Sequence, residues 1–128
     1  MKLLLDTCSF IWLTSAPDRL GAKARDALDA DQAEILLSDV SIWEICTKWL
    51  ARKLDLPSPP RVWIEEQASL WQLNRLPINP KACYRSTELP DLHRDPFDRM
   101  LVSQALDDGL TIVTPDDWIH KYPVAVLW

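Results

Sequence analysis

Cysteine, histidine and glycine are scarce in this chain of 128 residues, which contains three, two and two of them respectively. The cysteines, Cys8, Cys46 and Cys83, are odd in number and form no CxxC pair, so they indicate neither a disulfide framework nor a zinc site. No apolar run approaches the ~18 residues that a membrane helix needs. The apolar start of the chain is interrupted at Asp6, and no convincing cleavage site follows it. We therefore read it as mature structure and expect a cytoplasmic protein.

Basic residues are in the minority, with 14 Lys and Arg against 19 Asp and Glu and a formal net charge of −5. This balance argues against a generic basic coat for nucleic acid. It does not exclude an enzyme that acts on nucleic acid, because bound divalent cations can supply positive charge where substrate meets protein. A hydrophobic content of 48% with 26% charged residues predicts one globular domain over residues 1–128.

Strand-like and helical segments alternate along the chain, which predicts an α/β fold. Short apolar runs predict buried strands at residues 2–6, 34–38, 73–78, 110–114 and 124–128. Helical spacing and capping residues predict helices at residues 22–30, 39–53, 62–73, 81–87 and 96–108. The resulting βαβ units imply a mostly parallel sheet of about five strands with helices on both faces.

The segment "HRDPFDRM", residues 93–100, places Asp95 and Asp98 three residues apart around a proline. Asp95 suits a helix N-cap, Pro96 suits the first helical position, and Asp98 then faces the positive end of the helix dipole. Gly109 would close the same helix. Capping alone explains this pair locally, so its further role depends on what lies nearby.

Acidic residues from four separate segments are expected to meet at the carboxyl edge of the parallel sheet, where α/β proteins bind ligands. They are Asp6, Glu44, Asp95, Asp98 and Asp116, with Asp117 adjacent. Such a cluster is costly through like-charge repulsion unless a cation lies among its members. A divalent cation with oxygen ligands is the simplest candidate.

Each acid also has a structural explanation of its own. Asp6 can cap a turn, Glu44 can form a solvated pair with Lys48, and Asp116 and Asp117 can be N-terminal helix acids. What these local explanations leave open is the coincidence of all the acids at one edge of the sheet.

Five segments carry a resemblance to a known family: "LLLDTCSFIWL", "SDVSIWEICTKW", "LHRDPFDRMLVSQAL", "GLTIVTPDDW" and "YPVAVLW". In this order and spacing they resemble the PIN-domain family, and within it the VapC-type toxins of bacterial type II toxin–antitoxin pairs. The resemblance implies a three-layer α/β/α sandwich and a metal-dependent ribonuclease that cleaves RNA. It also implies a compact homodimer that a small cognate antitoxin inhibits.

The resemblance also assigns site residues. The acidic quartet of the family falls on Asp6, Glu44, Asp98 and Asp116. These carboxylates would hold one or two Mg²⁺ or Mn²⁺ ions, which would activate water and offset charge on the phosphate. Supporting positions are Asp95, which belongs to the "DPFDR" motif, and Thr7 and Thr114 as hydrogen-bonding partners of the carboxylates. Asp117 is a further supporting candidate, although it lies where the family pattern requires no acid.

Cations near the motifs are the candidates for substrate contact, namely Arg94, Lys48, Arg99 and Arg52. Arg99 has a structural alternative, which is to pair with Asp95 four residues earlier. The cysteines and histidines receive no part in the chemistry. Two other functions remain open: a non-catalytic PIN-like interaction module and a DNA-directed metal-dependent nuclease.

Seven tryptophans are many for a chain of this length. Some are expected at an interface, since Trp is enriched at protein contacts, although filling of a small core explains them equally well. Trp43, Trp49 and Trp63 are our candidates for an apolar groove that receives an antitoxin.

Overall fold

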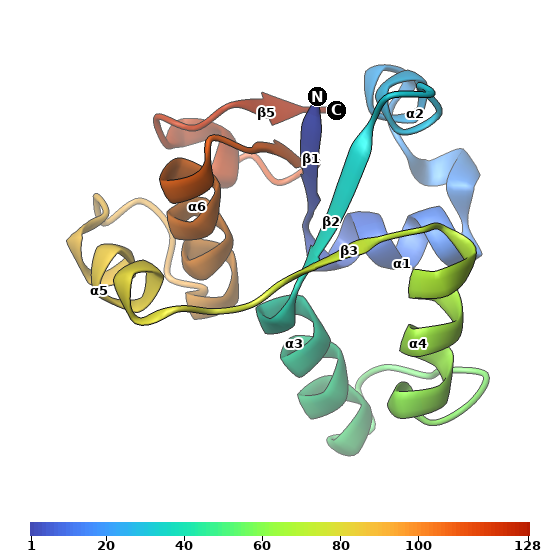
Figure 1. Ribbon diagram of the computed structural model, residues 1–128. Coiled ribbons are helices and arrows are strands. Elements are labelled where there is room, and N and C mark those ends of the chain that lie inside the picture. The colour runs from blue at the N-terminus through green and yellow to red at the C-terminus, as the bar shows by residue number, and fades with distance from the viewer.

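A five-stranded sheet runs through the computed structural model, which describes residues 1–128. Its strands are β1 (Lys2–Leu5), β2 (Glu34–Ser38), β3 (Asn74–Leu76), β4 (Thr111–Val113) and β5 (Val126–Leu127). They lie in the order β3-β2-β1-β4-β5, and every neighbouring pair is parallel (Figure 1). The carboxyl ends of all five strands therefore meet at one edge, as predicted.

Six helices surround this sheet. They are α1 (Thr7–Ser15), α2 (Ala22–Leu28), α3 (Asp39–Leu50), α4 (Pro60–Leu70), α5 (Pro80–Glu88) and α6 (Pro96–Asp108), with short 3₁₀ turns η1 (Pro17–Arg19) and η2 (Ile119–Lys121). In Figure 1, α1, α2 and α4 lie on one side of the sheet and α5 and α6 on the other, with α3 beyond the carboxyl ends of the strands. The three-layer arrangement is confirmed. None of the helices combines the length and the apolar character required to cross a bilayer.

The central strands are buried on both faces, which explains their continuous apolar runs. Leu3 and Leu5 of β1 enter one apolar cluster together with Phe10 of α1. Leu4, which points the opposite way, enters a second cluster with Leu101 of α6. The two clusters are the two cores of the sandwich, one on each side of the sheet.

Two helical predictions were incomplete. The sequence analysis missed α1, whose nine residues "TCSFIWLTS" are apolar on most sides and contain no amphipathic stripe. It also extended the helix that begins at residue 39 to residue 53, whereas α3 ends at Leu50, which is 78% exposed. The last turn of α3 lies at the end of the helix farthest from the sheet (Figure 1), and Trp49 is exposed there as well.

Two helices of this glycine-poor chain are followed by a non-glycine residue whose backbone is in the left-handed region. Gly109 closes α6 at φ +65°, as predicted, but Arg52 and Gln72 take the same conformation after α3 and α4. Arg52 lies in a Schellman turn, in which its N–H and that of Lys53 donate to the Trp49 and Lys48 carbonyls. A non-glycine residue there costs about 1–2 kcal/mol, and the turn directs the following chain back towards the carboxyl edge of the sheet.

Candidate active site

The first acidic position lies at the junction of β1 and α1. Asp6 is the N-cap of α1, and its Oδ1 accepts a 2.7 Å hydrogen bond from the Ser9 N–H. Its other oxygen, Oδ2, accepts a 2.6 Å bond from the Thr114 hydroxyl beyond β4. The side chain is buried, and this desolvation raises the pKa of Asp6 above its ordinary 3.8, while the bonds from Thr114 and Ser9 oppose the rise.

The second position, Glu44, lies in the second turn of α3 and is only 5% exposed. Its Oε1 accepts a 2.6 Å hydrogen bond from Thr7 Oγ1, and its Oε2 forms an ion pair with Lys48 Nζ. The hydrogen bond with Glu44 raises the pKa of the Lys48 ammonium. The Glu–Lys pair exists, but burial of Glu44 contradicts the picture of a solvated pair on an open helix face.

The third segment is the start of α6, which the sequence predicted to the residue. Asp95 is the N-cap and accepts hydrogen bonds from the N–H groups of Phe97 and Asp98. Asp98 Oδ2 lies 2.9 Å from His93 Nε2. Burial, followed by the charges of Asp95, Asp6 and Asp116, raises the pKa of Asp98 to about 7, and His93 opposes this rise. The carboxylates are therefore close enough to repel one another.

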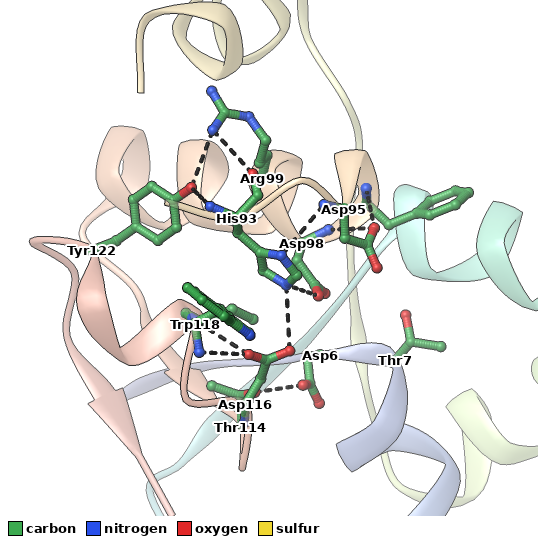
Figure 2. A network of polar contacts seen from close by, with 12 residues as sticks. Asp6, Thr7, His93, Asp95, Asp98, Arg99, Thr114, Asp116, Trp118 and Tyr122 are labelled. Carbon is green, nitrogen blue, oxygen red and sulfur yellow. Dashed lines mark hydrogen bonds and ion pairs between the residues drawn. The ribbon is translucent and has the colours of Figure 1, made fainter. Parts of the chain in front are cut away.

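The fourth segment follows β4. Thr114 Oγ1, which donates to Asp6, accepts a 3.0 Å hydrogen bond from the Asp116 N–H. Asp116 Oδ1 accepts a 2.7 Å bond from the Trp118 N–H, and its Oδ2 lies 3.4 Å from His93 Nε2. Figure 2 shows Asp116 directed towards His93, with Asp6 close by. One hydroxyl thus connects two acidic positions.

These four segments border a cavity of about 550 Å³. Its lining includes five carboxylates, from Asp6, Glu44, Asp95, Asp98 and Asp116, two lysines, Lys48 and Lys53, and an apolar side formed by Ile11, Trp12 and Leu54. The structure thus brings together the four acids of the predicted quartet and Asp95. Thr7 and Thr114 bond to Glu44 and Asp6, as expected of supporting residues.

Cys8 also lines the cavity. Burial, followed by the charge of Asp6, raises the pKa of its thiol to about 11. The thiol therefore stays protonated near neutral pH and is a poor nucleophile.

Several predicted supporting and substrate-contact residues lie elsewhere. Asp117 is exposed and outside the cavity lining, as are Arg94 and Arg52. Arg99 does not pair with Asp95: its guanidinium donates to Ser86 O at 2.7 Å, to Pro90 O at 2.9 Å and to the Tyr122 hydroxyl at 3.1 Å. Because these three bonds occupy the guanidinium, Arg99 belongs to the support of the loop before α6.

Three residues near the site were missed. His93 was given no role, yet its Nε2 contacts two of the four acids. Lys53 lines the cavity where Arg52 was expected, because the left-handed turn at Arg52 sets the direction of the chain. Trp12 was not considered at all. Of the three, only His93 could have been found from the sequence, because the segment "HRDPFDR" puts it close to Asp95 and Asp98.

The proposed apolar groove also needs correction. Trp63 is buried, with its ring 5.5 Å from that of Phe10 in an edge-on contact. Trp43 and Trp49 are exposed on α3. Since Trp63 belongs to the core, a surface made of all three tryptophans does not exist.

The all-parallel sheet between layers of helices, with carboxylates gathered at its carboxyl edge, makes this an α/β sandwich protein with an acidic cavity at the ligand-binding edge of the sheet. The match to known families is specific: the PIN domain model covers residues 3–124. The chain belongs to the PIN-domain family.

Individual relatives are more distant. The chain is 28% identical to "Ribonuclease VapC22" of Mycobacterium tuberculosis, with 94% of this chain and 93% of that protein covered. Among solved structures it resembles VapBC2 from Rickettsia felis bound to a promoter DNA fragment, at TM-score 0.74 and 16% identity over 98% of this chain and 97% of that one. It also resembles VapBC-5 from Mycobacterium tuberculosis, a member of the VapBC family of toxin–antitoxin systems, at TM-score 0.61 and 17% identity, covering 98% and 94%. These structural likenesses establish the fold.

Proposed function

We propose that this protein is a divalent-metal-dependent endoribonuclease that hydrolyses RNA phosphodiester bonds as the toxin of a toxin–antitoxin pair. The observation that carries the proposal is the convergence of Asp6, Glu44, Asp98 and Asp116 in one cavity. The similarity to a relative named a ribonuclease, over 94% of the chain, supports the choice of RNA.

The donor set fits Mg²⁺ or Mn²⁺. All the proposed ligand atoms of the quartet are carboxylate oxygens, which these hard cations prefer, and five carboxylates line the cavity against two lysines. Burial, followed by the charges of neighbouring carboxylates, raises the pKa of Asp98 to about 7, and a bound cation would relieve the repulsion among these carboxylates. When bound, one or two ions would supply an activated water and offset the charge that develops on the phosphate.

Other side chains of this protein would orient the metal ligands and contact the substrate. Thr7 and Thr114 fix one oxygen each of Glu44 and Asp6, so these carboxylates are oriented before any ligand arrives. Lys48 and Lys53 line the cavity, and their ammonium groups would contact the phosphates of a bound strand. Arg94 and Arg52 would then make outer contacts from the exposed surface nearby.

Partners follow from the same proposal. We propose that a small antitoxin binds the chain, since the structural relative VapBC-5 is a member of a toxin–antitoxin family. The exposed tryptophans of α3, Trp43 and Trp49, are candidate contacts. We further propose that residues 1–128 act as one domain, that the chain forms a homodimer, and that it works in the cytoplasm, where its RNA substrate is.

A cleavage assay tests the activity. Total RNA, and RNA and DNA oligonucleotides of one sequence, are incubated with Mn²⁺, with Mg²⁺ or with EDTA. We expect RNA to be cut in the presence of metal only, and Glu44→Gln to lose the activity. The exposed Asp117→Asn serves as a matched control that should keep it.

Two results would contradict the proposal. Cleavage of DNA in preference to RNA would favour a DNA-directed nuclease. A folded protein that binds Mn²⁺ but cuts neither polymer would leave the non-catalytic interaction module as the better description.

A further inference from the structure

We propose that His93 is a positioning residue: its Nε2 contacts the carboxylates of both Asp98 and Asp116 and keeps them side by side in the proposed metal site. This inference rests on the proposed function, since both acids belong to the proposed metal site. It assigns a role to a side chain that the acidic quartet does not include.

The contact geometry joins two distant parts of the chain. His93 Nε2 lies 2.9 Å from Asp98 Oδ2, at the start of α6, and 3.4 Å from Asp116 Oδ2, in the loop after β4. One potential ligand atom from each of these three residues lies within 4.8 Å of the other two. The imidazole side chain is 15% exposed, so water competes little for its N–H. Figure 2 shows the ring between the two carboxylates.

The other ring nitrogen decides what His93 does. The backbone N–H of Asp95 donates to His93 Nδ1 at 3.4 Å, so Nδ1 is the acceptor and Nε2 carries the hydrogen. A nitrogen that carries a hydrogen has no free lone pair for a cation. His93 is therefore built to donate to the ligands of the ion and not to be a ligand itself.

The backbone of His93 is also held in place. Its N–H donates to the hydroxyl of the buried Tyr122 at 2.9 Å, and the same hydroxyl accepts a bond from Arg99 at 3.1 Å. Arg99 donates in addition to the His93 carbonyl at 3.4 Å. Tyr122 follows η2, and Arg99 lies in α6, so two separate elements fix the loop that carries His93 (Figure 2).

The same arrangement recurs across the site. Thr7 donates to Glu44, Thr114 donates to Asp6, and His93 donates to Asp98 and approaches Asp116. Each donor orients a carboxylate of the proposed metal site without being a ligand of the ion itself. Hydrogen-bond partners of this kind, one step removed from the metal, typically contribute about 10–100-fold to metal affinity.

The first experiment measures the dissociation constant for Mn²⁺ by calorimetry. We expect His93→Ala to bind Mn²⁺ at least about tenfold more weakly than wild type. His93→Gln, whose amide N–H can replace the Nε2 donor, should stay within about threefold. Leu92→Ala, in the same loop, is the control for general loosening and should bind as wild type does.

The second experiment asks whether His93 touches the ion. Electron spin echo spectroscopy of the Mn²⁺-loaded protein should show no coupling to a directly bound imidazole nitrogen. Tyr122→Phe keeps the ring but removes the hydroxyl that holds the His93 backbone, and should weaken Mn²⁺ binding about two- to fivefold. This variant provides a test even where His93→Ala does not fold.

The outcomes separate this inference from the proposed function. A folded wild type that fails to bind Mn²⁺ overturns the proposed function itself. If wild type binds and folded His93→Ala binds equally well, or if a bound imidazole nitrogen is detected, the positioning role of His93 is wrong while the metal site stands. Wild-type affinity in Tyr122→Phe would remove the part assigned to the backbone support.

Discussion

Removing one proposed metal ligand should make the metal-free protein more stable. Asp98→Asn replaces a carboxylate by a neutral amide that still offers an oxygen to His93. Burial and the charges of neighbouring acids raise the folded-state pKa of Asp98 from 3.8 to about 7. Since the raised pKa penalises the ionised folded state, the wild type loses stability as pH rises from about 4 through about 7, and the variant does not.

The magnitude follows from that pKa. A carboxyl whose pKa moves from 3.8 to about 7 on folding costs at most about 4 kcal/mol once both states are ionised, at about 1.4 kcal/mol per pH unit. Burial is the largest part of this cost, and Asp95, Asp6 and Asp116 share the repulsion and can relax, so we expect a gain of about 1–3 kcal/mol at pH 8. For a chain of this length that is a rise in Tm of at least about 3 °C.

Urea denaturation in EDTA at pH 4, 6 and 8 measures this difference directly. The exposed Asp117→Asn is the matched control and should shift the free energy of unfolding by less than about 0.5 kcal/mol at any pH. The reasoning is refuted if Asp98→Asn is no more stable than wild type at pH 8, or if its advantage does not grow with pH.

Four further substitutions test three separate parts of the account. Thr114→Val keeps the shape but removes the donor to Asp6, so the metal-free protein should lose about 1–3 kcal/mol in urea denaturation; an unchanged midpoint would show that this bond is unimportant. Lys48→Ala should weaken RNA binding and reduce the salt slope by roughly 0.7, measured by fluorescence anisotropy across salt concentrations; an unaltered slope would remove Lys48 from the interface. Trp63→Ala should cost about 3–5 kcal/mol of stability, because Trp63 is a core residue. Trp49→Ala should leave stability within about 0.5 kcal/mol and weaken antitoxin binding in a pull-down. The reverse pattern would contradict the assignment of Trp63 to the core and of Trp49 to the binding surface.

Local signals made much of the fold predictable. The N-cap at Asp95, the proline after it and Gly109 define α6 to the residue, because capping and the left-handed end depend on neighbours in sequence. The strand at residues 34–38 was likewise found with its bounds, since its apolar run has a clear start and end. The convergence of the acids followed from one topological rule for parallel sheets.

What the sequence did not reveal depends on contacts between distant segments. The role of His93 requires the loop after β4 to bring Asp116 within 3.4 Å, a distance that no local pattern encodes. Lys53 reaches the cavity because Arg52 takes a left-handed conformation that usually selects glycine. Arg99 was assigned to substrate because its partners, above all Tyr122, come from a part of the chain 23 residues away.

The central claim is that the acidic cavity binds a divalent cation, and Mn²⁺ calorimetry on wild type and Asp98→Asn tests it most directly. The account predicts saturable binding by wild type at millimolar Mn²⁺ or below and a sharp loss of binding in the variant. Because the variant should be the more stable protein, that loss could not be attributed to unfolding. A folded wild type that shows no binding at millimolar Mn²⁺, or a variant that binds equally well, would contradict the account.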